Sequence, residues 1–197
     1  LIKTHTVDGT VSVPKSGKTS VLCSVTTPIG AQLTGITIAV SYNKEKLTLI
    51  PEQYESDYFV GDLFQNQLEM VDVTDSKIAL MSFGIADSVN NAFPGGTSDF
   101  VRLNFKVSED VILEEGDITV TVTDAVNFDL ETITEKFGTS VTYLRLDTSA
   151  LETAIEKAKI LDEGVYTTDS FQAVQQALSI AETVLEKENV TQQEVDN

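Results

Sequence analysis

The alternation of hydrophobic and polar positions is clearest in residues 33–50. Apolar side chains fall at every second position from residue 36 to residue 42. The positions between them carry small side chains, namely Gly35, Thr37, Ala39 and Ser41. A period of two is that of a strand with one buried face, and residues 43–46 then predict a polar turn before a short strand at 47–50. Small outward side chains leave a sheet flat, which suits a protein surface better than a small molecule.

The same strand period recurs along residues 1–146. It marks residues 7–13, 19–26, 70–74, 77–85, 100–107, 117–126 and 139–146. Asp75 and Ser76 predict a tight hairpin between two of these strands. In the strand after that turn both alternating sets are largely apolar, which is typical of a covered strand or of one that awaits a partner. About nine strands without a helical period predict an antiparallel, jelly-roll-like β-sandwich over residues 1–146.

The period changes to that of helices at residue 147. Ser149 and Glu152 form an S-x-x-E capping box, and apolar residues at helical spacing follow. Thr167 is predicted to cap a second helix, and a T-x-x-E box at Thr191 predicts a third. Two such helices bury too little to be stable alone. Residues 147–197 therefore predict a small α-helical bundle, whose third helix is expected to be truncated or not covered by this chain.

The charge excludes several classes of partner. The chain of 197 residues has 31 acidic and 13 basic side chains, a net charge of -18 and a pI near 4.2. Such a protein repels the phosphate backbone of nucleic acids, and no basic cluster is present to engage anionic lipid. No apolar run reaches the roughly 18 residues of a membrane span. No signal peptide opens the chain, which begins abruptly at Leu1, as an excised segment would.

The inventory of reactive side chains argues against catalysis. His5 is the only histidine and Cys23 the only cysteine. A nucleophilic triad or a zinc site therefore lacks the residues it needs. We expect a solvated or locally hydrogen-bonded His5 and a Cys23 that is buried as a small hydrophobe.

Carboxylates are the only abundant group that could bind a metal ion. They cluster at three places, which are Asp72 with Asp75, Glu114 with Glu115 and Asp117, and Asp129 with Glu131. No calcium-binding loop of the EF-hand kind is present, and we expect solvated loop charges at all three places. The sequence thus predicts a non-catalytic protein with no metal site and no cofactor.

Several of these strands resemble those of cohesin modules. The segment ITIAVSYNKEKLTLI at 36–50 resembles the strand pair of that family, with Asn43-Lys44 where the family has Asp-Pro. DSKIALMSFGIA at 75–86, FVRLNFKV at 100–107 and residues 118–127 resemble its later strands. The resemblance implies that residues 1–146 are a cohesin-like domain. It also implies a partner, the dockerin of another secreted protein, which is a small helical module that carries the calcium.

Cohesins bind dockerins through one sheet face, and the resemblance implies which residues would form it here. They are Gly35, Thr37, Ala39, Val73, Leu80, Ser82 and Leu130. We expect these side chains to face outward, with Leu80 and Leu130 as apolar anchors. The alternative for Leu80 and Ile78 is that residues 51–69 simply cover them.

The helical part is similar to the FIVAR modules of secreted carbohydrate-active enzymes. The matching segments are LETAIEKAKIL at 151–161, YTTDSFQAVQQALSIAETVL at 166–185 and NVTQQEVDN at 189–197. Together the two resemblances imply a non-catalytic piece of a secreted or cell-surface bacterial glycoside hydrolase, monomeric when unbound, with a helical spacer. Two other functions stay open: a carbohydrate-binding module, although the chain has no Trp, and a structural spacer of a surface adhesin.

Overall fold

The computed structural model describes residues 3–13, 17–61, 63–64, 67–84, 91–109, 111–145, 147–186 and 192–196. It divides into two compact units, one ending at Leu144 and the other beginning at Arg145. Each unit is treated by itself below.

Nine strands make up most of the first unit, which confirms the predicted number. They are β1 (His5–Val13), β2 (Lys18–Thr27), β3 (Leu33–Tyr42), β4 (Leu47–Ile50), β5 (Gln67–Thr74), β6 (Lys77–Gly84), β7 (Gly96–Val107), β8 (Ile118–Asn127) and β9 (Phe137–Arg145). Short 3-10 helices η1 (Glu55–Tyr58) and η3 (Thr134–Lys136) lie between strands. Ile85, expected at the end of the sixth strand, lies outside the described residues.

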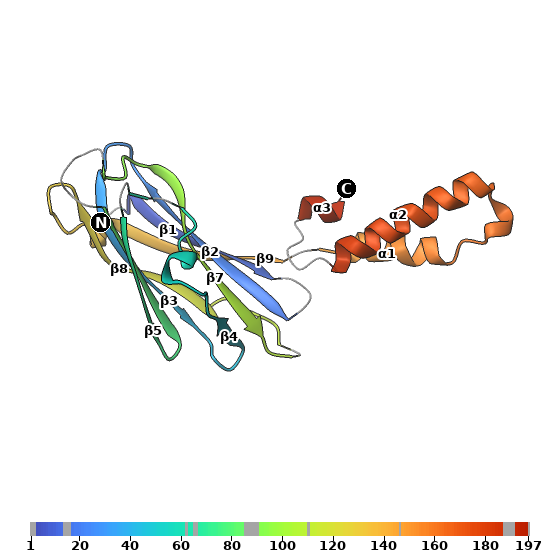
Figure 1. The fold of residues 1–197 in the computed structure, drawn as a ribbon, viewed down its shortest axis with the longest axis horizontal. Coiled ribbons are helices and arrows are strands. Elements are labelled where there is room, and N and C mark those ends of the chain that lie inside the picture. Colours follow the sequence, from blue (N-terminus) through green and yellow to red (C-terminus); the bar gives the residue numbers. More distant parts are fainter. Residues whose placement is uncertain are drawn as a thin grey trace. The chain divides into compact units, whose positions relative to one another are not determined.

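The strands form two sheets that pack face to face as a sandwich (Figure 1). One sheet has the order β4-β7-β2-β1-β9, and the other has the order β5-β6-β3-β8. The pairings of β3 with β6 and β8, and of β5 with β6, are antiparallel. The predicted hairpin is present, with Asp75 at a φ of 49° in its two-residue turn.

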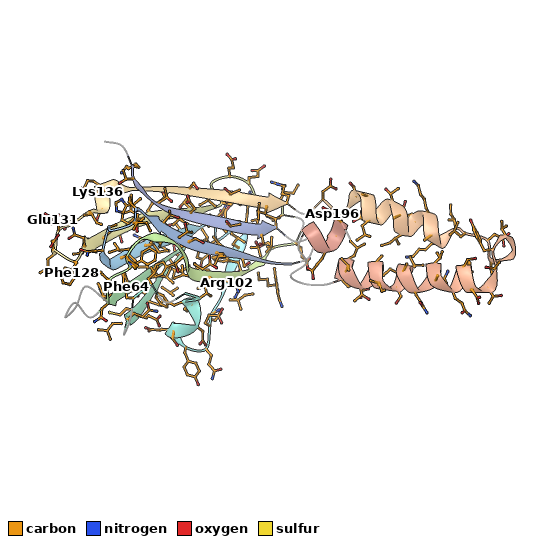
Figure 2. The ribbon with its side chains drawn as sticks, turned by 90° about the horizontal axis from the view of Figure 1, so that it is seen from above. Phe64, Arg102, Phe128, Glu131, Lys136 and Asp196 are labelled. Atoms are coloured by element: carbon orange, nitrogen blue, oxygen red, sulfur yellow. The ribbon has the colours of Figure 1, made fainter. Side chains whose placement is uncertain are left out.

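The core lies between the sheets and follows the predicted alternation of β3. Ile36, Ile38 and Val40 are 0–1% exposed and face the other sheet. Cys23 is also fully buried among core residues, as predicted, and burial raises its pKa to about 12. Figure 2 shows side chains filling the space between the two sheets.

The segment between β4 and β5 completes the core at one side. Tyr58, Leu63 and Phe64 are each at most 5% exposed and belong to the core cluster. Gly61 lets this segment approach β7 closely, because a Cβ there would lie 1.9 Å from the carbonyl oxygen of Asp99. The segment therefore packs against the sandwich core.

The second unit contains three short helices among its described residues. They are α1 (Ser149–Lys159), α2 (Thr168–Glu186) and α3 (Gln192–Asp196), with the 3-10 turn η4 (Glu163–Val165) after α1. The predicted third helix is present as a short segment, although Thr191, its expected cap, is outside the described residues. No helix in the described part of the chain is both long and apolar enough to cross a membrane.

The starts of the first two helices test the predicted caps. Thr167 Oγ1 accepts a hydrogen bond from the Ser170 backbone N–H at 3.4 Å, so this cap is confirmed. The capping box at Ser149 is wrong, because Ser149 is already the first helical residue and its own N–H donates to Asp147 Oδ1 at 3.0 Å.

Candidate protein-binding face

The outer face of the four-stranded sheet is the surface that turns away from the core. Strand register arranges its side chains in four rows that run from β5 across β6 and β3 to β8. In that order the rows are Leu68, Phe83, Gly35 and Val126; Met70, Met81, Thr37 and Asp124; Asp72, Ala79, Ala39 and Thr121; and Thr74, Lys77, Ser41 and Thr119. We call these sixteen positions the outer face.

The middle of the outer face is a floor of small side chains on β3. Gly35, Thr37 and Ala39 lie there, as predicted. Thr37 is 8% and Ala39 1% exposed, so both are buried although they lie on the outer face. A Cβ at Gly35 would lie only 3.1 Å from Cδ1 of Phe83, so the Phe83 ring leans over the glycine. The floor therefore consists of small side chains, and Phe83 covers it at Gly35.

Four large apolar side chains occupy one corner of the outer face, on β5 and β6. We call Leu68, Met70, Met81 and Phe83 the apolar corner. Leu68 is 62% and Met70 55% exposed, whereas Met81 and Phe83 are half-buried. The two methionines are the only ones in the chain, and their Cα atoms are directly paired across the strands. Exposed neighbouring apolar side chains of this kind are typical of protein-binding surfaces.

Two of the predicted face residues lie on the opposite side of β6, so their predicted placement is wrong. Leu80 is 0% exposed, pairs with Ile38 and belongs to the core. Ser82 is also 0% exposed and pairs with Ile36. Its hydroxyl donates to Gln67 Oε1 at 3.3 Å, so the buried polar group has a hydrogen-bond partner. The residues of β6 that face outward are the alternate ones, Ala79, Met81 and Phe83.

Val73 is also misplaced by the prediction. It is 48% exposed, but its Cα partner is Ile78, which is fully buried. Val73 therefore lies on the core side of β5, close to the hairpin turn, where the other sheet does not cover it. Cover by segment 51–69 was the alternative expected for Ile78 and Leu80. The structure buries both in the core cluster, to which Tyr58, Leu63 and Phe64 of that segment also belong.

Leu130 is exposed on a tightly held turn after β8, as predicted. Its side chain is 76% exposed and its φ is 61°, a backbone conformation that non-glycine residues rarely adopt. The turn is closed by the Glu131 N–H, which donates to Asn127 Oδ1 at 2.8 Å, and by the Leu130 N–H, which donates to the Asn127 carbonyl at 3.0 Å. Figure 2 shows Phe128 and Glu131 of this turn at one end of the sandwich.

Asp124 lies on the outer face beside an irregularity of β8. The register with β3 shifts between Thr37 and Ile38, which leaves Thr123 without a Cα partner and places Thr123 and Asp124, both exposed, side by side. Such bulges bend a strand and redirect a side chain. Within the described part of the chain, no ion pair involves Asp124.

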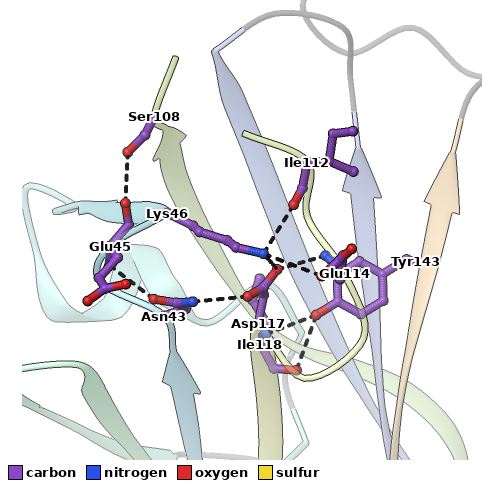
Figure 3. Close-up of polar contacts among 9 residues, drawn as sticks. All are labelled: Asn43, Glu45, Lys46, Ser108, Ile112, Glu114, Asp117, Ile118 and Tyr143. Carbon is purple, nitrogen blue, oxygen red and sulfur yellow. Dashed lines mark hydrogen bonds and ion pairs between the residues drawn. The ribbon is translucent and has the colours of Figure 1, made fainter. Parts of the chain in front are cut away.

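A partly buried ion pair lies at the end of the sheet where β3 ends and β8 begins (Figure 3). Lys46 Nζ lies 2.8 Å from Asp117 Oδ2 and donates to the Ile112 carbonyl at 3.2 Å. Asn43 Nδ2 and the Glu114 N–H donate to the same carboxylate at 3.1 and 2.7 Å. Asn43, which stands where the resembled family has Asp, thus has a structural role in the turn.

The environment of Asp117 corrects the expectation of a solvated charge there. The residue is 7% exposed. Burial raises the pKa of Asp117, but the hydrogen bonds from Lys46, the Glu114 backbone and Asn43 outweigh it and hold the pKa below its usual value. Among the described residues, no group of three or more His, Cys, Asp or Glu side chains could hold a metal ion.

His5 is buried at the start of β1, so it is not solvated. It is 5% exposed, its Nδ1 lies 2.8 Å from Thr4 Oγ1, and its ring centroid lies 4.9 Å from that of Phe137. The locally hydrogen-bonded alternative is therefore the correct one. Burial, and to a smaller degree the charge of Lys136, lowers the pKa of His5.

The apolar corner and Asp124 were not among the predicted site residues. β6 is apolar on both sides, so alternation alone could not say which set faces outward. For β8, the core positions Ile118, Val120 and Val122 are followed by Ala125 instead of residue 124. This break in the period of two was the available signal for the irregularity that exposes Asp124.

Comparison with known proteins gives the fold of the first unit. No protein-family model and no curated protein matches the chain. The cohesin CaCohA2 of Clostridium acetobutylicum, solved in complex with a dockerin, matches with 16% identity, a TM-score of 0.54 and coverage of 72% of this chain and 100% of its own. The cohesin of a type I cohesin–dockerin complex from Clostridium thermocellum matches with 16% identity, a TM-score of 0.52 and coverage of 72% and 99%.

A third solved structure extends the likeness to another cohesin type. Type II cohesin A11 of Bacteroides cellulosolvens is 12% identical, with a TM-score of 0.51 and coverage of 71% of this chain and 99% of its own. The first unit thus has the fold of cohesin modules, a two-sheet β-sandwich.

Proposed function

We propose that the first unit is a non-catalytic module that binds a calcium-loaded dockerin through its outer face. The observation that carries the proposal is the outer face itself, where the floor of small side chains on β3 lies beside the exposed apolar corner. An apolar patch beside a floor of small side chains fits the side of a helix. Solved cohesins with the same fold bind dockerins, which supports this class of partner.

The residues proposed to contact the dockerin combine earlier predictions with the exposed side chains. Gly35, Thr37 and Ala39 form the floor, and Leu130 is an anchor at the β8 end. The apolar corner takes the place that Leu80 was expected to fill. Large, exposed apolar side chains become hot spots when a partner excludes water from them.

The wider context is also a proposal. The FIVAR-like sequence of the helical unit supports a spacer within a secreted or cell-surface bacterial carbohydrate-active enzyme, with another part of that protein performing catalysis. Calcium belongs to the dockerin in this scheme. Chelation with EDTA should therefore abolish binding while leaving the circular dichroism spectrum of this chain unchanged.

Calorimetric titration against calcium-loaded dockerins tests the proposal. We expect one-to-one binding that Met70→Asp weakens at least about tenfold, because a buried unpaired charge replaces an apolar contact. Leu144→Asp is the matched control. Leu144 is 54% exposed, close to the 55% of Met70, and it lies on β9 in the other sheet. Equal losses in both variants would contradict the assignment of the face.

Methionine oxidation provides a second measurement that requires no substitution. Dilute hydrogen peroxide oxidises accessible thioethers to sulfoxides. Mass spectrometry should show slower oxidation of Met70 and Met81 when a dockerin is bound.

If no dockerin binds, the function proposed for the first unit is wrong, and a glycan array would then examine the carbohydrate-binding alternative.

A further inference from the structure

The outer face carries charge of only one sign over most of its area. Its first three rows hold twelve residues, of which two are acidic, Asp72 and Asp124, and none is basic. Lys77, the single basic side chain of the face, is in the fourth row. The whole chain carries a net charge of -18. A partner approaching this face therefore meets a negative potential.

The two acids lie at opposite edges of the sheet. Asp72 is on β5 and Asp124 is on β8, and both are exposed. Three strand spacings of about 4.8 Å separate these strands, or about 14 Å in total. An α-helix with its side chains is about 10–12 Å wide. A helix lying over β6 and β3 thus fits between the two carboxylates.

The surface between the acids matches one side of such a helix. Met81 and Thr37 separate Asp124 from Met70 within one row, so apolar contacts and a carboxylate lie side by side. The irregularity of β8 turns Asp124 outward next to Thr123. Bulges that redirect a side chain in this way recur next to functional sites.

From this arrangement we propose that the docking element of the partner is an amphipathic helix whose apolar stripe is flanked by basic side chains. Asp124 pairs with one of these Lys or Arg side chains and determines which partners bind. Asp72 attracts a second basic side chain on the other flank. The inference rests on the proposed function, because it describes the chemistry of the partner on the same face.

The test uses the intact chain and the calcium-loaded dockerins of the cohesin complexes that share its fold. The dockerin that binds most tightly is titrated against wild type, Asp124→Asn, Asp124→Lys and Asp72→Asn. Glu115→Gln is the control, because Glu115 is an exposed acid in the turn before β8 and lies off the outer face. Circular dichroism verifies that each variant is folded.

We expect Asp124→Asn to weaken binding about fivefold and Asp124→Lys about fiftyfold, since the second change places like charges together. Asp72→Asn should cost about twofold, and Glu115→Gln should cost nothing. Raising the salt concentration should weaken wild-type binding more than it weakens binding by Asp124→Asn.

The results separate this inference from the proposed function. If wild type binds a dockerin and both Asp124 variants bind within twofold of it, the inference is wrong and the proposed function stands. Tighter binding by Asp124→Lys would also overturn it, because the partner would then be acidic at this place. If wild type binds none of the dockerins, the proposed function and the inference both fail.

Discussion

Two buried titratable side chains make the stability of the first unit depend on pH. Asp117 has a pKa below its usual value because its hydrogen bonds outweigh its burial. His5 has a pKa below its usual value because of burial and the charge of Lys136. In both cases the unfolded chain binds a proton more readily than the folded one, so stability falls as the pH falls. For His5 the fall begins near pH 6.5, and for Asp117 near pH 3.8.

Substitution of Asp117 should separate the two contributions. Asp117→Asn removes a carboxylate that accepts from three donors, so we expect a lower urea midpoint than wild type at pH 7. The difference should shrink as the pH falls below 3.8, where the unfolded wild-type chain takes up a proton at Asp117, and should vanish at still lower pH, where the folded carboxylate is protonated too. Urea titrations between pH 7 and pH 2 measure this. A constant difference over that range would show that the charge of Asp117 does not contribute.

At the scale of elements, β6 has one side in the core and one side on the outer face. Ile78 and Leu80 are fully buried, whereas Met81 and Phe83, on the other side, are half-buried. The strand is apolar on both sides: one side packs in the core, and the other belongs to the face proposed to bind a partner. Its alternate residues should therefore respond differently to truncation.

Paired alanine substitutions in β6 test this difference. Leu80→Ala should lower the free energy of unfolding by about 2–5 kcal/mol, because it leaves a cavity in the core. Met81→Ala should lower it by less than about 1 kcal/mol, since a surface position loses little packing. Denaturant unfolding measures both effects. Equal losses would indicate that the outer side of β6 is also covered within the molecule.

The sequence predicted where the strands lie better than it predicted which side of each strand faces the core. Alternation located nine strands and oriented β3 correctly, because only one of its two sets of side chains is large and apolar. It could not orient β6, where both sets are apolar. Leu80 and Ser82 were chosen from the resemblance and from one of the two apolar sets, and strand register contradicts that choice.

Local chemistry also limited the predictions at loops and helix ends. Glu114 and Asp117 look alike in the sequence, but Asp117 is buried because Lys46 and Asn43 reach it from a distant segment. Such long-range partners are not visible in a local pattern. Thr167 was predicted correctly as a cap because its hydrogen bond is made within the next three residues.

At the scale of the whole molecule, the two units differ in how much they bury. The sandwich has a large core, with more than twenty fully or nearly fully buried apolar side chains. In the described part of the helical unit, only Ile155 and Val195 are less than 9% exposed. Ile160, Val165 and Ile180 are each more than 65% exposed there. The helical unit should therefore be the less stable of the two.

Thermal unfolding of the intact chain should show this difference. We expect the helical circular dichroism signal at 222 nm to decay first and over a broad temperature range. The helical unit has few buried contacts, so its unfolding has low cooperativity. The accessibility of Cys23 to a thiol reagent reports the second transition, since this residue is buried in the sandwich. A single sharp transition in both signals would show that the units unfold together.

The apolar corner lies on one short segment of the chain, which affects how easily the proposed binding preference can change. All four of its side chains come from a single hairpin, residues 67–84, with a two-residue turn. Under the proposed function, replacing this short contiguous segment changes the partner, provided that Ile78, Leu80 and Ser82 are kept for folding. Recombination or gene synthesis of eighteen codons could then diversify recognition while the scaffold stays constant.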